Sequence, residues 1–259
     1  MIFETHAHYD DGRFDEDREQ LLNSLKEAGV GPVINIGASL ESTKQTMELA
    51  EAYDFVYAAV GVHPSEIHEL NEESFQWITS LAHHPKTVAI GEIGLDYYWD
   101  KEEEVQANQR EWFRRQLRLA RKVSLPVVIH SRDAGADTLA ILKEEKAEEI
   151  PGVIHCYSYS KELALEFVKI GFYIGIGGVL TFKNARKLVE TVEAIPMERI
   201  LLETDCPYMA PEPYRGKRNS SLYLPYVVEK IAELKGITKE EVERITWENA
   251  TKLFTKVNV

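Results

Sequence analysis

The chain has 259 residues and a formal net charge of −13, from 30 basic and 43 acidic side chains. This excess of acid excludes a protein that coats nucleic acid non-specifically, because such binding depends on many cations close to phosphates. An enzyme that neutralises phosphate with metal ions and a local basic patch is still compatible with the charge. Hydrophobic residues make up 44% of the chain, which is enough for a sizeable core without disulfides.

The two cysteines, Cys156 and Cys206, are few for this length and indicate a reducing compartment, so a cytoplasmic protein is predicted. The first residues carry neither a basic segment nor a long apolar one, and we expect no signal peptide. No run approaches the roughly 18 apolar residues of a membrane helix, so no membrane association is expected. The acidic surface favours solubility but says little about assembly. The expected oligomeric state is a monomer or a weak oligomer.

Short apolar runs alternate with amphipathic stretches along the whole chain. The apolar runs predict strands at 1–8, 33–37, 55–60, 87–90, 126–130, 152–155, 172–175 and 200–205. The amphipathic stretches predict helices at 15–28, 40–53, 74–83, 103–122, 138–145, 161–170, 185–194, 224–235 and 239–256.

This alternation predicts the α/β class, with parallel strands joined by right-handed crossovers. Eight such units suggest one closed (β/α)8 TIM barrel, which we expect to span residues 1–259 as a single domain. A doubly wound open sheet is the alternative fold. It would be favoured by a glycine-rich dinucleotide-binding turn after the first strand, and the sequence has none there.

Residues able to bind metal stand at or just past the ends of several predicted strands. Side chains two apart in a strand point to the same face, so His6 and His8 can present two imidazoles to one ion. Later strands end in a similar way, at Glu92, His130, His155 and Asp205. Because the carboxyl ends of the strands meet at one mouth of a barrel, these six residues predict one metal centre.

Six ligands exceed what one tetrahedral zinc takes, and a carboxylate such as Glu92 can bridge two ions. Nitrogen and oxygen ligands are compatible with Zn²⁺, Mn²⁺ or Mg²⁺, and the sequence does not distinguish among these ions. Cys156 and Cys206 follow ligands directly, so on strand geometry they should point to the other face as packing residues. Two divalent metal ions predict hydrolysis, with a metal-bound hydroxide as the nucleophile and Asp205 as the base.

Two further residues are candidates for a catalytic role. Glu203 lies two residues before Asp205 on the same face, where it either orients a ligand or stays a buried, hydrogen-bonded carboxylate. His63 follows the third strand, where it contacts substrate phosphate, donates a proton or is an ordinary loop histidine.

The segment 206–221 is long, irregular and rich in proline, and such loops inside compact domains are usually functional. It carries three cations among tyrosines, a composition that suits phosphate binding and base stacking. Arg132, Lys183 and Arg186 follow other strands and could extend this patch over the same face. The predicted substrate-binding residues are Arg132, Arg215, Lys217, Arg218 and Asn219.

Several motifs resemble those of the TatD family of metal-dependent deoxyribonucleases, within the metallo-dependent hydrolase superfamily. They are Thr5-His6-Ala7-His8, Gly61-Val62-His63-Pro64, Gly91-Glu92-Ile93-Gly94-Leu95-Asp96-Tyr97, His130-Ser131-Arg132, His155-Cys156, Leu202-Glu203-Thr204-Asp205 and Arg215-Gly216-Lys217-Arg218-Asn219. The blocks at 91–97 and 203–205 are highly specific to that family, whereas His-x-His is shared across the superfamily.

The resemblance implies a barrel with a two-metal site at the positions of the six predicted ligands. It also implies 3′→5′ hydrolysis of single-stranded DNA ends, with RNA as a further substrate, by a mostly cytosolic family. His63 matches a histidine near the substrate, and Glu203 matches a carboxylate beside the site. Some relatives have been proposed to be D-aminoacyl-tRNA deacylases, so an ester or amide hydrolase is the alternative. A non-catalytic barrel is disfavoured because all six ligands are present.

The sequence departs from the family pattern in three places. Glu4 stands where an aspartate is usual, Tyr157-Ser158-Tyr159 replaces Phe-Ser-Gly, and Ser220-Ser221 replaces Glu-Pro. None of these changes removes a predicted metal ligand. The last two lie on the expected substrate face and therefore bear on substrate preference more than on catalysis.

Overall fold

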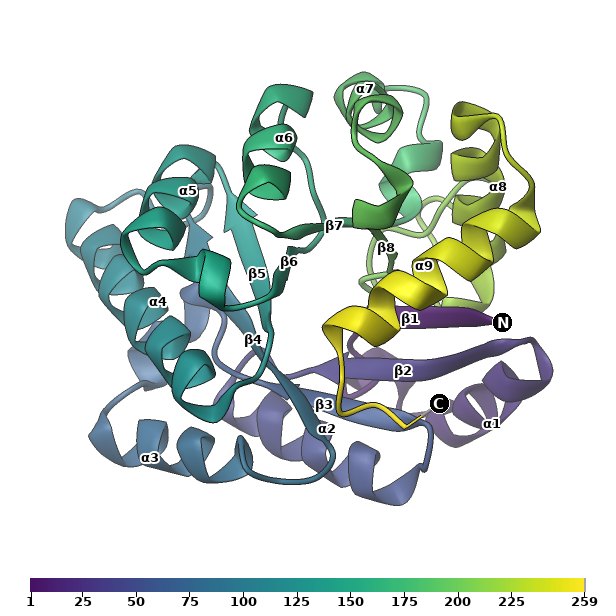
Figure 1. Cartoon of the computed structure of the whole chain (residues 1–259). Coiled ribbons are helices and arrows are strands. Elements are labelled where there is room, and N and C mark those ends of the chain that lie inside the picture. The colour runs from purple at the N-terminus through teal and green to yellow at the C-terminus, as the bar shows by residue number, and fades with distance from the viewer. Residues whose placement is uncertain (259) are drawn as a thin grey trace.

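The computed structural model describes residues 1–258 and contains one sheet of eight parallel strands in the order of the sequence. The strands are β1 (Ile2–Ala7), β2 (Val30–Ile36), β3 (Val56–Val60), β4 (Thr87–Asp96), β5 (Val127–Arg132), β6 (Gly152–Ile154), β7 (Tyr173–Ile176) and β8 (Ile200–Leu202). A parallel bridge between Ala7 and Cys206 joins the first strand to the segment after the last, so the sheet nearly closes on itself. The predicted (β/α)8 barrel is confirmed (Figure 1).

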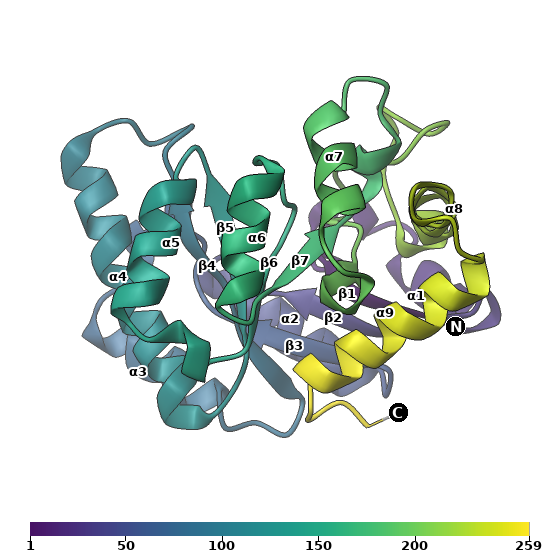
Figure 2. The same cartoon turned by 45° about the horizontal axis from the view of Figure 1, so that its top comes forward.

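Helices follow the strands, and all but the last lie around the outside of the barrel (Figures 1 and 2). They are α1 (Arg18–Glu27), α2 (Leu40–Ala52), α3 (Glu72–Leu81), α4 (Glu103–Val123), α5 (Gly135–Glu144), α6 (Lys161–Lys169), α7 (Arg186–Ala194), α8 (Leu224–Lys235) and α9 (Lys239–Leu253). Their ends follow local chemistry: Gly236 ends α8 with a φ of 64°, and Thr238 begins α9 with a capping box. None of the helices described up to residue 258 is long and apolar enough to span a membrane.

Side chains along the strands alternate between two hydrophobic clusters. In β5, Val127 and Ile129 belong to the larger cluster, which includes the buried faces of the surrounding helices, whereas Val128 belongs to the smaller one. The smaller cluster also contains Leu253 and Phe254 from the end of α9. Helix α9 therefore closes the amino-terminal end of the barrel interior, and the carboxyl ends of the strands are left for the site (Figure 1).

Strand β4 is longer than the sequence indicated, because glycines interrupt its apolar pattern. It continues to Asp96, whereas the apolar run ends at Ile90. Gly94 has a φ of 142°, and a Cβ there would lie 1.9 Å from the carbonyl oxygen of His130 on β5. Only glycine fits this close approach. As a result Glu92 lies inside β4 rather than at its end. Strand β8 is shorter than predicted and ends at Leu202.

Candidate metal centre

A cavity of about 1040 Å³ opens at the carboxyl ends of the strands. Its volume is at the upper end of sites for small ligands, so it has room for part of an extended substrate. Its acidic lining residues are Asp10, Asp11, Glu66, Glu92, Asp96, Asp100 and Asp205. Within residues 1–258, Arg132 is the one arginine or lysine in this wall. A wall of this charge repels a polyanion unless cations neutralise it.

Closure of the barrel brings the first group of predicted ligands together. The His8 amide donates to the Cys206 carbonyl over 2.8 Å, and the Asp205 amide donates to the His6 carbonyl over 2.9 Å. The Nε2 atoms of His6 and His8 lie 3.1 Å apart. They lie 3.6 and 3.3 Å from Oδ1 of Asp205. Two imidazoles and a carboxylate within this distance can hold one divalent ion.

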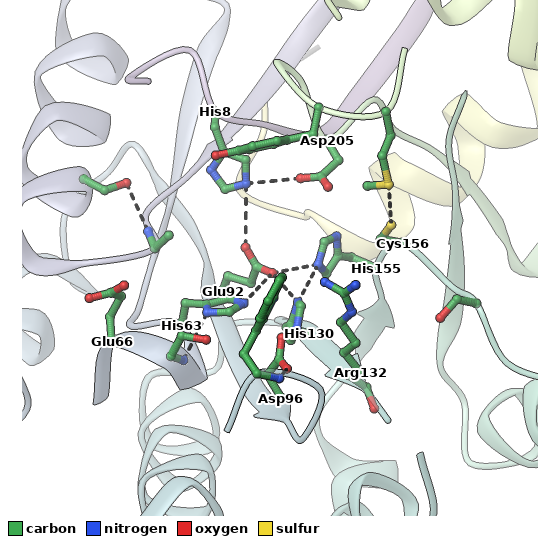
Figure 3. A pocket seen from close by; sticks show the side chains of 18 of the residues that line it. His8, His63, Glu66, Glu92, Asp96, His130, Arg132, His155, Cys156 and Asp205 are labelled. Atoms are coloured by element: carbon green, nitrogen blue, oxygen red, sulfur yellow. Dashed lines mark hydrogen bonds and ion pairs between the residues drawn. The ribbon is translucent and has the colours of Figure 1, made fainter. Parts of the chain in front are cut away.

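Glu92 lies between two groups of side chains (Figure 3). The first group is His6, His8 and Asp205, and the second group is His63, His130 and His155. Oε2 of Glu92 is 3.6 and 3.7 Å from the two Nε2 atoms of the first group. Its Oε1 is 2.9 Å from Nδ1 of His130, 2.7 Å from Nε2 of His155 and 3.8 Å from Nε2 of His63. A carboxylate with one oxygen toward each group has the position of a bridging ligand.

In two histidines, a hydrogen bond to one ring nitrogen leaves the other nitrogen directed at the proposed metal positions. Nδ1 of His8 lies 2.9 Å from the carbonyl oxygen of Ile36, which can only accept a hydrogen bond, so Nε2 is the nitrogen directed at the first group. Nε2 of His130 lies 3.0 Å from Oδ2 of Asp96, and its Nδ1 is directed at Glu92. Both rings are therefore oriented as metal ligands usually are.

Three buried atoms behind the first group have no hydrogen-bond partner among the described residues: Nδ1 of His6, Nδ1 of His155 and Oε2 of Glu203. The two imidazoles are stacked with their centroids 3.9 Å apart, and donor atoms of all three residues lie within 4.8 Å of one another. An unsatisfied buried polar atom costs about 1–3 kcal/mol, so such atoms are usually satisfied by an ion or a proton donor. The residues present thus fit bound divalent metal.

Burial and mutual contacts shift the pKa values of these groups. Burial favours the neutral form of Glu92, but His155 and His63 outweigh it and hold the pKa of Glu92 well below its usual range. Burial lowers the pKa of His63 to about 3, with His130 adding to the effect. Burial raises the pKa of Glu203 to about 8. At neutral pH, Glu92 is therefore an anion and His63 is neutral.

The predicted catalytic residues Glu203 and His63 both lie at the centre. Glu203 is buried, and its Oε1 accepts the Cys156 amide over 2.5 Å and lies 3.9 Å from Nδ1 of His155. His63 lines the cavity, and its Nδ1 accepts the Ser65 amide over 3.2 Å. Glu203 is thus a buried, hydrogen-bonded carboxylate beside His155, and His63 faces the cavity.

The predicted basic loop is only partly directed at this cavity. Arg132 lines it, whereas Arg215, Lys217 and Arg218 are not among the residues of its wall. Arg218 instead donates to Asp17 over 2.8 Å, and these two residues are 201 positions apart in the sequence. If Arg215 and Lys217 bind substrate, they do so outside the cavity.

Asn219, which was predicted to bind substrate, is fully buried and is not part of the cavity wall. Its amide nitrogen donates to the carbonyl oxygens of Thr204 and Tyr208, and its Oδ1 accepts the Ser220 amide. These bonds use its hydrogen-bonding capacity to hold the loop against the segment after β8.

The two cysteines behave differently. Cys206 is a buried core residue, as predicted. Cys156 was also expected to point away from the site, and this is wrong, since it lines the cavity with its Sγ 3.8 Å from Sδ of Met209. Strand β6 ends at Ile154 and Cys156 has a φ of 45°, so the two-residue period of a strand does not apply there.

Asp96 is a site residue that the sequence reasoning missed. It is 1% exposed, and it contacts His130 through Oδ2 while Oδ1 accepts the amides of Tyr98 and Trp99. It follows Glu92 by four residues, so a strand extended to residue 96 would have placed both on the same face. The glycines of β4 concealed that extension.

We expect Asp96→Ala to weaken divalent metal binding about 10- to 100-fold, the usual effect of removing a carboxylate behind a metal-bound histidine. The reason is that His130 loses the acceptor that orients its ring. Competition titration with a metal-sensitive dye measures the affinity. Asp54→Ala, which removes an exposed carboxylate before β3, serves as the control. Equal affinity in wild type and Asp96→Ala would contradict the orienting role.

The barrel of eight parallel strands, the histidine and carboxylate groups at their carboxyl ends and the relatives described next together define a metal-dependent hydrolase. The chain belongs to the TatD family, since the family's sequence model, described as TatD related DNase, matches residues 3–255. It is 48% identical to the uncharacterized metal-dependent hydrolase YabD of Bacillus subtilis (strain 168), over 98% of this chain and 99% of that protein.

It is also 34% identical to a protein of Cronobacter sakazakii named 3′-5′ ssDNA/RNA exonuclease TatD, over 98% of each chain. Among solved structures, the crystal structure of YjjV, a TatD homologue from Escherichia coli K12, matches with a TM-score of 0.91 and 32% identity, over 98% of each chain. These similarities extend over almost the full length of the chain.

Proposed function

We propose that this protein is a phosphodiesterase that removes nucleotides from the 3′ ends of single-stranded DNA, with RNA as a further substrate. The observation that carries the proposal is that Glu92 contacts both ligand groups, in the wall of a cavity where acidic side chains outnumber the one arginine. The name of the Cronobacter sakazakii relative supports the choice of substrate.

The proposed ligands of two divalent ions are His6, His8, Glu92, His130, His155 and Asp205. Such ions, as Mg²⁺, Mn²⁺ or Zn²⁺, would neutralise phosphate charge and lower the pKa of an attacking water. The protein positions the other groups. Asp205 has a side chain 15% exposed and a pKa held below its usual range against the effect of burial, chiefly by its hydrogen bond to His8, so it is an anion at neutral pH. It accepts the proton of the water.

Two residues of the wall bind the substrate in this proposal. His63 is neutral and lies beside Glu92, from where it can donate a hydrogen bond to the phosphate or the leaving oxygen. Arg132 is the one arginine or lysine of the described cavity wall, and it can pair with a flanking phosphate. Glu203 orients the imidazole of His155 from behind.

The proposal predicts a metal-dependent ladder in a gel time course with 5′-labelled single-stranded DNA, compared in Mg²⁺, Mn²⁺, Zn²⁺ and EDTA. Products should shorten from the 3′ end, and His155→Ala, prepared in parallel, should yield none. The variant controls for contaminating nucleases. Intact DNA and RNA under every metal would contradict the proposal. Release of free amino acid from charged tRNA, with the RNA chain intact, would then assign the site to ester hydrolysis.

A further inference from the structure

Two large aromatic side chains are exposed at the rim of the cavity. Trp99 is 67% exposed and Tyr98 is 42% exposed, and Trp99 lines the cavity itself. Their ring centroids lie 4.7 Å apart and the rings are nearly perpendicular. Aromatic surface left open beside a binding cavity gains free energy when a ligand covers it, so exposed surface of this kind marks a contact site.

Arg132 completes this surface. Its guanidinium carbon lies 3.9 Å from the ring centroid of Tyr98 and 5.5 Å from that of Trp99. Tyr98, Trp99 and Arg132 together form what we call the rim platform. It combines flat aromatic faces with a cation, the combination that binds single-stranded nucleic acid by stacking on bases and pairing with phosphate.

The rim platform is held at a fixed position relative to the metal centre. Oδ1 of the buried Asp96 accepts the amides of Tyr98 and Trp99 over 3.0 and 3.1 Å. Oδ2 of the same carboxylate lies 3.0 Å from Nε2 of His130. One side chain thus orients a proposed metal ligand and the turn that carries the aromatic pair. In Figure 3, Asp96, His130 and Arg132 lie close together below the proposed bridging carboxylate.

We propose that the rim platform stacks one unpaired nucleobase of the substrate, next to the phosphodiester that is cleaved, with Trp99 as the principal stacking surface. This inference rests on the proposed function and narrows its substrate. A base within a duplex has its faces covered by its neighbours, so the platform selects a strand with an unpaired end. Because every base has a π-face, it imposes little sequence preference.

Binding tests the rim platform without relying on turnover. A short oligothymidylate with phosphorothioate linkages is titrated into the Mn²⁺-loaded protein, and tryptophan fluorescence is recorded. Stacking on Trp99 is expected to quench the emission, and Trp99→Ala is expected to lose that quenching and weaken binding about 10-fold. Trp99→Phe should retain most of the affinity. Leu165→Ala, which removes an exposed apolar side chain of α6 outside the cavity, is the control.

An abasic substrate provides the second arm. A single abasic residue moved along the last positions of the 3′ end should slow wild-type cleavage about 10-fold at one position, and Trp99→Ala should show no further loss there. Normal cleavage, with equal rates on abasic and intact strands and unchanged binding in Trp99→Ala, would overturn the platform and leave the proposed function intact. If no cleavage is seen but binding depends on Trp99, the rim platform is supported and the proposed function is contradicted.

Self-association is the competing occupant of this aromatic surface. If Trp99→Ala changes the sedimentation coefficient of the protein but not its affinity for the oligonucleotide, the platform contacts a second copy of the chain and our proposal is overturned. If the sedimentation coefficient stays constant while the affinity falls, the proposal is supported.

Discussion

Glu92→Ala is expected to remove both bound metal ions and to lower hydrolysis about 10³-fold or more. The Glu92 carboxylate lies within 4 Å of imidazole nitrogens from both ligand groups, and its side chain is only 5% exposed. No other carboxylate among the described residues has an oxygen within 4 Å of imidazole nitrogens from both groups. Without it, the second group keeps only imidazoles, and the first group keeps Asp205 as its single anion. Elemental analysis of the dialysed protein measures the metal, and the gel assay measures hydrolysis.

The control for Glu92→Ala must also break a carboxylate–imidazole pair. Glu51 and His84 form such a pair over 3.4 Å outside the cavity, so Glu51→Ala should keep full metal content and activity. Glu92→Gln keeps the size of the side chain and separates loss of metal from loss of packing, and circular dichroism checks the fold of each variant. Retention of two metal ions in Glu92→Ala and Glu92→Gln would refute the ligand assignment.

Most of the barrel could be predicted from the sequence because its signals are local. Most strands contain a short apolar run that is buried, and most helices carry one apolar face. The position of the ligands then follows from topology: once β1 and β8 are parallel neighbours, His6, His8 and Asp205 must meet. The rule that strand ends converge at one mouth of the barrel therefore predicted that residues about 200 positions apart in the sequence lie together.

The predictions from the sequence were wrong or incomplete where the backbone departs from the regular conformation of a strand. Gly94 allows β4 to pass close to β5, and it also interrupts the apolar run that would have revealed Asp96. Cys156 has a positive φ, so strand alternation misplaced its side chain. In the loop after β8, the cationic side chains can be counted from the sequence, but where they point cannot be predicted from it. Arg218 is directed by Asp17, a partner that only the fold brings near.

Two departures from the family pattern contact each other. Glu4 on β1 is fully buried, and its Oε2 accepts the hydroxyls of Ser221 over 2.8 Å and of Thr204 over 2.7 Å. Its Oε1 accepts the amides of His6 and Thr204. The glutamate, longer than the usual aspartate, thus reaches a serine that stands in the Ser-Ser replacement. This network ties the strand that carries the histidines to the segment that carries Asp205.

Asp205→Asn is expected to lower the rate of the chemical step about 10²- to 10⁴-fold, the usual contribution of a positioned base. Asparagine keeps the size of the side chain and one oxygen for an ion, but it cannot take the proton of the attacking water. Single-turnover kinetics measure the step without product release. Asp137→Asn removes a carboxylate outside the cavity, where it pairs with Tyr97, and should leave the rate unchanged.

Metal content decides how a slow Asp205→Asn enzyme is interpreted. Asp205 lies 3.3 Å from Nε2 of His8 and 3.6 Å from Nε2 of His6, so it is both a proposed ligand and the proposed base. If Asp205→Asn keeps two ions and still loses the rate, proton transfer is the lost contribution. If metal and rate fall together and saturating metal restores the rate, Asp205 acts as a ligand alone.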